Sequence, residues 1–296
     1  GCCLALQAEQ DEPAVWDYIV VGAGTGGSLC AARLASSGAQ VLLLEGGGWD
    51  TPKLYNVSTA GGRSDWAGDW SYPTRFPRKL TVQNSPGKKR IVNAGRLMGG
   101  SSALHGDVYD RPSPREFELA GLRSWTAERI ASAMERVEAS LTLSYIGEDD
   151  WEELPAVQAH VADRLMTGLG LSHHPQGPEI RGPKAGLSSG WVYFRECDSE
   201  AKNCRRSTSY NDLIPPLNTS SITVLPHALV SRVLLEDGQA VGVELLRAGQ
   251  RHTAFARRGV VLAAGALGTP KILMLSGIGD PLELQRLRIP VQVANR

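Results

Sequence analysis

The sequence carries no net charge and few cysteines, and both shortages exclude classes of function. Lysine plus arginine equals aspartate plus glutamate, at 31 each in 296 residues, so no net field draws the chain to nucleic acid or to an anionic surface. Five cysteines are too few for a disulfide scaffold. No C-x-x-C pair or His/Cys cluster has zinc-ligand spacing, so no metal site is predicted. The composition therefore favours a small-molecule partner.

Long apolar runs are also missing. No stretch approaches the roughly 20 apolar residues that a membrane-spanning helix needs, so no membrane span is predicted. Residues 1–12 read as the remnant of a secretory signal peptide or as a disordered tail. Asn-x-Ser triplets at Asn56 and Asn218 agree with export, although such triplets are common by chance. Secretion is thus one reading of a localisation that the sequence leaves unknown.

Two of the cysteines, Cys197 and Cys204, flank a polar loop. A secreted protein would allow them to pair. Two separate thiols are an equally good reading of the sequence.

The strongest local pattern lies near the start of the chain. A β-branched run at 17–21 leads directly into the glycine-rich segment 22–27, which has the form G-x-G-x-x-G. Residues 28–37 carry apolar side chains at helical spacing, and 40–44 form a second buried-strand run ending at Glu45. This order predicts the strand, turn, helix and strand of a dinucleotide-binding fold.

Each glycine of the turn has a physical role in that prediction. Gly22 permits the tight turn, Gly24 lets the backbone approach a pyrophosphate, and Gly27 lets helix and strand pack closely. The phosphates would meet free N–H groups at the helix N-terminus, beside Thr25 and Gly26. A carboxylate at position 45 can accept hydrogen bonds from ribose hydroxyls, which favours FAD or NAD over NADP.

Two further segments are glycine-rich. Residues 95–106 read GRLMGGSSALHG and are followed by Val108-Tyr109, and residues 265–279 read GALGTPKILMLSGIG. The first segment resembles the first motif of the glucose-methanol-choline (GMC) oxidoreductase family, with Met98 as a volume-conserving departure. The second resembles the family's second motif at every specified position. The chain is thus similar to the N-terminal part of a GMC oxidoreductase, and the resemblance implies FAD as the cofactor.

The resemblance also implies which positions contact FAD. In the family the first motif lies against the flavin and pyrophosphate, a backbone valine meets the adenine, and one residue before the first motif touches the cofactor. With the glycine turn and the ribose acid, the predicted cofactor-binding residues are Gly22, Gly24, Thr25, Gly26, Gly27, Glu45, Trp70, Ser101, His105, Gly106, Val108 and Val230.

His105 bears on how the flavin is held. Members that tether the flavin covalently carry a histidine four residues after the glycine pair, and that place is Leu104 here. His105 lies one residue later, where relatives have Asn or His as a non-covalent contact. We therefore expect dissociable FAD.

The resemblance implies an α/β fold, with an FAD/NAD(P)-binding Rossmann-like domain at 13–115 and 200–296. A partial substrate-binding region at 116–199 interrupts it, with helices expected near 125–141 and 154–169. Asp237-Gly238 predicts a hairpin turn. A strand at 259–264 is expected to lead into a helix whose N-cap and first residue are Thr269 and Pro270.

The implied function is FAD-dependent oxidation of a small alcohol or sugar, with hydride passing from a CH–OH group to the flavin. The electron acceptor is not assigned. Relatives continue for a comparable further length that carries the active-site histidine, so the catalytic part is expected to lie outside this sequence and no catalytic residue is named. Two alternatives stay open: an FAD-containing non-redox lyase of the same family, and a degenerate, non-catalytic flavin-binding protein.

Overall fold

The structure is a computed structural model. It describes residues 15–49, 68–75, 89–105, 108–109, 112–145, 160, 164, 167–168, 172–173, 186–187, 192–193, 195–197 and 204–295. These residues fall into two compact units. The first holds the described residues up to 103 and from 209 onward, and the second holds those between 104 and 208.

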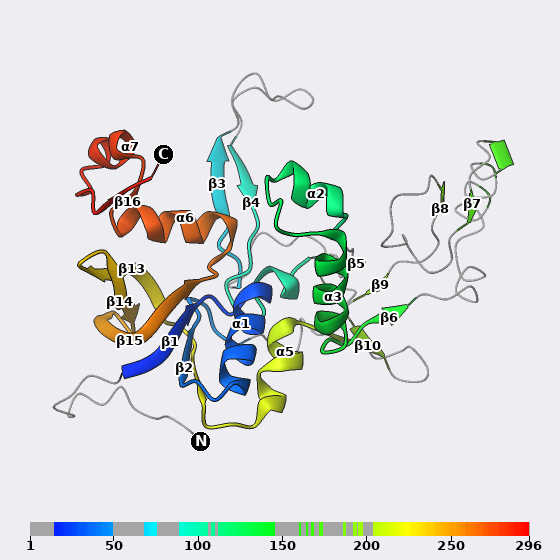
Figure 1. Ribbon diagram of the computed structural model, residues 1–296, viewed down its shortest axis with the longest axis horizontal. Helices are drawn as coiled ribbons and strands as arrows, with labels where there is room; N and C mark the ends of the chain where they lie inside the picture. Colours follow the sequence, from blue (N-terminus) through cyan, green and yellow to red (C-terminus); the bar gives the residue numbers. More distant parts are fainter. Residues whose placement is uncertain are drawn as a thin grey trace. The chain divides into compact units, whose positions relative to one another are not determined.

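A six-stranded sheet forms the centre of the first unit (Figure 1), in the order β12-β2-β1-β15-β14-β13. Strands β12, β2, β1 and β15 are parallel neighbours, and β14 and β13 continue the sheet in antiparallel fashion. The strands are β1 (Val15–Val21), β2 (Val41–Leu44), β12 (Ile222–Leu225), β13 (Leu229–Glu236), β14 (Gln239–Arg247) and β15 (Gln250–Leu262). The parallel part is the sheet of a Rossmann-like domain.

Alternation along the strands divides the core between the two faces of this sheet. Ile19 and Val21 of β1 belong to one buried cluster, which also contains Ile272 of α6 (Gly265–Leu275). Val20 belongs to the opposite cluster, which contains Tyr210 of α5 (Ser209–Leu213) and alanines of α1 (Thr25–Ser36). Helices α1 and α5 lie side by side on one face of the sheet (Figure 1), and α6 packs on the other. Helices therefore cover both faces.

The first unit is completed by short elements. Strands β3 (Tyr72–Arg75) and β4 (Lys89–Val92) pair in antiparallel fashion, and β16 (Ile278–Gly279) pairs with β17 (Val293–Ala294) in parallel. The remaining helices of the unit are the 3₁₀ turns η4 (Gly100–Ala103) and η6 (Pro215–Leu217) and the α-helix α7 (Pro281–Arg286).

The second unit contains two well-capped helices. Ser113 and Glu116 form a capping box at the start of α2 (Pro114–Leu119), and the Thr126 hydroxyl caps α3 (Ala127–Glu138). Its short strands are β5 (Val108–Tyr109), β6 (Ser144–Tyr145), β7 (Ser172–His173), β8 (Gly186–Leu187), β9 (Val192–Tyr193), β10 (Arg195–Cys197) and β11 (Cys204–Arg206). Strand β9 pairs with both β5 and β6, and β10 pairs with β11.

Most expected elements of the first unit are confirmed. The strand, glycine turn, helix and strand of residues 15–45 are present, and Asp237 and Gly238 turn the β13–β14 hairpin with positive φ values of 50° and 77°. In the second unit α3 matches the first expected helix, whereas the second is described only at positions 160, 164, 167 and 168, all helical. Residues 1–12 and the triplet at Asn56 lie outside the described residues, and Asn218 is exposed.

The expected start of α6 is wrong. The helix begins at Gly265 after the N-cap Ala264, and Pro270 lies inside it. Gly265 has a φ of 81°, which lets the chain turn directly from β15 into the helix. The Thr269 hydroxyl does satisfy a free donor, since it accepts the Ala264 N–H at 3.0 Å, but it does so from within the helix.

No helix among the described residues is long and apolar enough to cross a bilayer.

Candidate cofactor site

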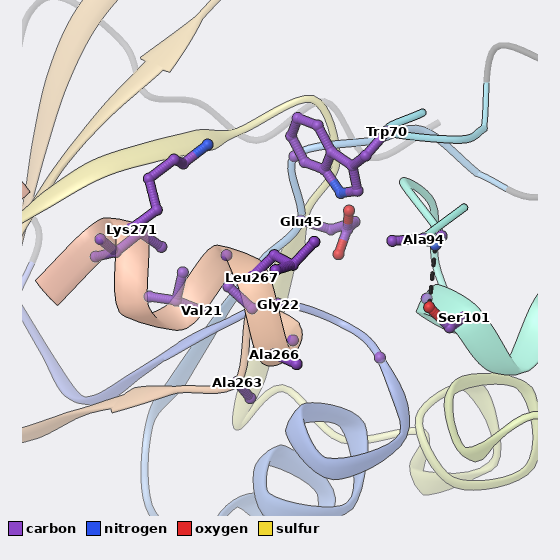
Figure 2. A pocket seen from close by; sticks show the side chains of 18 of the residues that line it. Val21, Gly22, Glu45, Trp70, Ala94, Ser101, Ala263, Ala266, Leu267 and Lys271 are labelled. Atoms are coloured by element: carbon purple, nitrogen blue, oxygen red, sulfur yellow. Dashed lines mark hydrogen bonds between the residues drawn. The ribbon is translucent and has the colours of Figure 1, made fainter. Parts of the chain in front are cut away.

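A cavity of about 450 Å³ lies where β1 and β2 end, and all its lining residues belong to the first unit. The carboxyl ends of parallel strands are where open α/β sheets bind ligands. Figure 2 shows Val21 of β1, Glu45 directly after β2, Ser101 of η4 and residues of α6 around this space. The sequence-predicted residues that line it are Gly22, Gly24, Thr25, Gly26, Glu45, Trp70, Ser101 and Val230.

The glycine turn forms one side of the cavity through close backbone contacts. Gly22 has a φ of 100°, and a β-carbon there would lie 2.4 Å from the carbonyl oxygen of Ala263. A β-carbon on Gly27 would lie 1.9 Å from the Gly22 carbonyl oxygen. Gly27 is buried and is not among the lining residues, so it serves the helix–strand packing that the sequence predicts for it. These contacts leave the N-terminal N–H groups of α1 beside the cavity.

The turn of the first GMC-like motif meets the first glycine turn backbone to backbone. Gly100 has a φ of 58°, and a β-carbon there would approach the Gly24 α-carbon to 2.7 Å. The next residue, Ser101, is exposed to the cavity, and its hydroxyl accepts the Gly95 N–H at 3.0 Å (Figure 2). Two sequence-distant glycine loops thus form one continuous wall.

Glu45 is the buried acid of the site, with 6% of its surface exposed. The Ala23 N–H donates to Oε2 and the Gly47 N–H donates to Oε1, both at 2.9 Å. Burial raises the pKa of this carboxyl group, while the two backbone donors and the charge of Arg96 act in the opposite direction. The carboxylate is therefore held in one orientation at the edge of the cavity.

Trp70 lies over this acid in a cluster of aromatic and cationic side chains (Figure 2). Its ring stacks on Tyr72 with centroids 6.0 Å apart, and it packs against Gly46, where a β-carbon would lie 3.2 Å away. The Arg96 guanidinium is 4.8 Å and the Lys271 amine 5.4 Å from the Trp70 ring centroid. Both distances allow cation–π attraction, which fixes the ring as a wall of the cavity.

The start of α6 supplies lining residues that the sequence reasoning missed. Ala263, Ala266 and Leu267 border the cavity, and Lys271 extends from the next turn toward Trp70 (Figure 2). The second GMC-like motif marks this segment, for which the sequence predicts a strand and a helix but no site residue. Arg96 was missed as well, because its contribution acts through Trp70 and Glu45 rather than by lining the cavity.

Three predicted contacts lie outside the unit that holds the cavity, and the structure does not test them. His105 and Val108 belong to the second unit, and Gly106 lies outside the described residues. Arg206 donates from Nη1 to the His105 carbonyl oxygen at 2.9 Å. Burial and the Arg206 charge lower the pKa of the His105 imidazole. Val108 lies in β5, opposite Tyr193 of β9. Their contact with the cofactor stays a prediction.

The fold and the site define a class of protein. Parallel strands ending at a glycine turn, a helix N-terminus at the cavity and an acid after the second strand are the features of a dinucleotide-binding protein of the Rossmann type. A sequence profile described as GMC oxidoreductase matches residues 16–287, and the chain belongs to this family. The cofactor of the family's N-terminal domain is FAD.

Curated relatives agree with this assignment. The chain is 31% identical over 308 residues to mitochondrial choline dehydrogenase of Homo sapiens, an alignment that covers 93% of this chain and 48% of the relative. It is 31% identical over 280 residues to oxygen-dependent choline dehydrogenase of Vibrio vulnificus, covering 92% and 49% respectively. The chain therefore spans about half the length of the curated relatives it matches.

Solved structures support the fold. Pyridoxine 4-oxidase from "Mesorbium loti" aligns with a TM-score of 0.75 at 25% identity, over 94% of this chain and 55% of the other. A formate oxidase aligns with a TM-score of 0.78 at 24% identity, over 97% and 52%. The likeness to the formate oxidase concerns the fold alone.

Proposed function

We propose that this chain binds FAD in the cavity of the first unit and serves as the flavin-holding part of an alcohol-oxidising enzyme. The observation that carries the proposal is the doubly anchored Glu45 beside the glycine turn, because it combines a ribose acceptor and a pyrophosphate cradle in one cavity. Family membership selects FAD among the dinucleotides.

The residues present suit the adenosine and pyrophosphate parts of FAD. Gly24 and Gly100 meet closely, and a β-carbon on Gly100 would occupy the space between the two turns. The absence of side chains there allows backbone N–H groups to approach phosphate oxygens. The Glu45 carboxylate would accept hydrogen bonds from ribose hydroxyls and would repel a 2′-phosphate. Val230 and Trp70 offer apolar walls for the adenosine end, and Ser101 a hydroxyl farther along.

In the proposed reaction, bound FAD supplies the hydride acceptor for oxidation of a CH–OH group. The contribution of this chain is to bind and orient that group and to keep its phosphates out of bulk water. A choline-like small alcohol is the first substrate class to test, because the curated relatives are named choline dehydrogenases. The names of these relatives do not fix an electron acceptor for this chain.

FAD binding is tested on the chain itself. We expect apoprotein titrated with FAD to quench flavin fluorescence with one site per chain, and acid precipitation to leave the yellow colour in the supernatant. Colour retained by the precipitate would contradict non-covalent binding, and absence of saturable quenching would contradict the proposed site.

Turnover is tested separately, on the natural protein that contains this chain at its full length. Anaerobic addition of choline or another primary alcohol should bleach the oxidised flavin band. Bound FAD that no alcohol reduces would support the lyase or degenerate readings instead.

A further inference from the structure

The β10–β11 pair places two cysteines opposite each other. The strands are antiparallel, with Cys197 facing Cys204, Glu196 facing Arg205 and Arg195 facing Arg206. The spacing of the two cysteines in the sequence leaves pairing undecided, whereas the register makes them direct cross-strand partners.

Direct cross-strand partners meet the distance requirement of a disulfide. Opposite residues of antiparallel strands have α-carbons about 4.5 to 5.5 Å apart and share one face of the ladder. Disulfides bridge α-carbons about 4.4 to 6.8 Å apart. The α-carbon spacing of such partners therefore falls within the range that a disulfide bridges.

We propose that Cys197 and Cys204 form an intrachain disulfide that closes the β10–β11 hairpin when the protein meets a disulfide oxidant such as glutathione disulfide. One cysteine thiolate attacks glutathione disulfide, forming a mixed disulfide and releasing one glutathione thiolate. The second cysteine thiolate attacks the protein sulfur of that mixed disulfide and releases the second glutathione. Two protein thiols are oxidised, one glutathione disulfide is reduced to two glutathione molecules, and the two thiol protons pass to the released thiolates.

The proposed disulfide would restrain strand β11, which positions a buried arginine. Strand β11 ends at Arg206, whose side chain holds the His105 carbonyl oxygen. Arg206 is 2% exposed, so its position depends on the path of this strand. A disulfide at Cys204, two residues before Arg206, limits the conformations from which that contact must form.

Trypsin offers a direct test, because it cleaves after Arg195, Lys202 and Arg205. Each cysteine then lies in its own peptide, 196–202 and 203–205, and only a disulfide holds the two together. Folded protein is equilibrated with excess glutathione disulfide, blocked with iodoacetamide, digested and analysed by mass spectrometry. We expect one species with the summed mass of both peptides less two hydrogens, which separates into the two thiol peptides after reduction. Both cysteines alkylated, or each carrying glutathione, would overturn the proposal.

Serine variants separate this link from unspecific oxidation. Cys197→Ser and Cys204→Ser should each abolish the linked species and leave the remaining cysteine with glutathione. Cys30→Ser removes an exposed thiol of α1 and should leave the link unchanged. A species linking Cys30 to either hairpin cysteine in amounts equal to the 197–204 species would also overturn the proposal, because proximity in the register would then give no selectivity.

Discussion

At the scale of single residues, the site depends on Glu45, a buried carboxylate with a backbone donor on each oxygen. Glu45→Gln replaces one acceptor with an amide N–H₂ that faces a backbone N–H, so one donor loses its partner. We expect the Kd for FAD to rise about 10- to 100-fold, the equivalent of about 1.4 to 2.8 kcal/mol. Fluorescence titration measures it. Glu236→Gln, at the exposed end of β13, is the matched control and should bind FAD like the unmodified chain.

Glu45 should make the stability of the apoprotein and its affinity for FAD depend on pH in opposite directions. Burial raises the pKa of Glu45 above its ordinary value of 4.5. At pH values between 4.5 and the raised pKa, the Glu45 carboxyl group of the folded apoprotein binds a proton more readily than that of the unfolded chain. The contribution of Glu45 to the free energy of unfolding therefore falls as pH rises through this range. FAD affinity should change the other way, falling as pH drops through the raised pKa, because the ribose hydroxyls need the carboxylate as acceptor.

Thermal unfolding of the apoprotein and FAD titrations across this pH range measure the two trends. Glu45→Gln should show neither. An FAD affinity in the unmodified chain that stays constant down to pH 4.5 would contradict the assignment of Glu45 as the ribose acceptor.

At the scale of elements, the contact between η4 and the start of α1 is made by two glycines. Gly100→Ala combines a left-handed backbone with a β-carbon 2.7 Å from the Gly24 α-carbon. Gly38→Ala is its matched control, since Gly38 lies in the same unit and has a φ of 86° and nothing within 4 Å of the added carbon. We expect Gly38→Ala to lose about 1 to 2 kcal/mol of stability through backbone strain alone.

Gly100→Ala should lose more stability than the control, and FAD affinity should fall at least about 10-fold, because the two walls of the cavity must separate. Chemical denaturation and FAD titration of both variants measure the difference. Equal losses of stability and of FAD affinity in the two variants would mean that the close approach of the two turns contributes to neither.

At this scale, the sequence predicts the elements that a short sequence pattern defines. The strand, glycine turn and helix of residues 15–45 each have such a pattern, and the role of Glu45 follows from its position directly after the second strand. The roles of Lys271 and Arg96 could not be predicted, because they arise from packing on Trp70, which lies far from Lys271 and about 25 residues from Arg96 in the sequence. The pairing of β12 with β2 joins segments far apart in the chain, which no local pattern encodes. The start of α6 was misplaced because Thr269 satisfies the Ala264 N–H from inside the helix.

At the scale of the whole molecule, the two compact units give a test of the predicted contacts at His105, Gly106 and Val108. The cavity residues all belong to the first unit, so ADP should raise the unfolding temperature of that unit alone. FAD carries the flavin as well. If the three residues contact the flavin, FAD should also stabilise the second unit. Differential scanning calorimetry with each ligand measures this, and an FAD effect confined to the unit that ADP stabilises would contradict the predicted contacts.

The position of strand β15 late in the sequence affects how the protein folds during its synthesis on the ribosome. Residues 259–262 pair with 18–21 of β1, and the carbonyl oxygen of Ala263 lies directly over Gly22. The first glycine turn is therefore made early in synthesis but lacks its neighbouring strand and α6 until late. Bringing such distant segments together is entropically demanding and slow. Nascent chains that end before β15 should emerge without a nucleotide pocket, so the cofactor can be captured only when the last part of this sequence has left the exit tunnel.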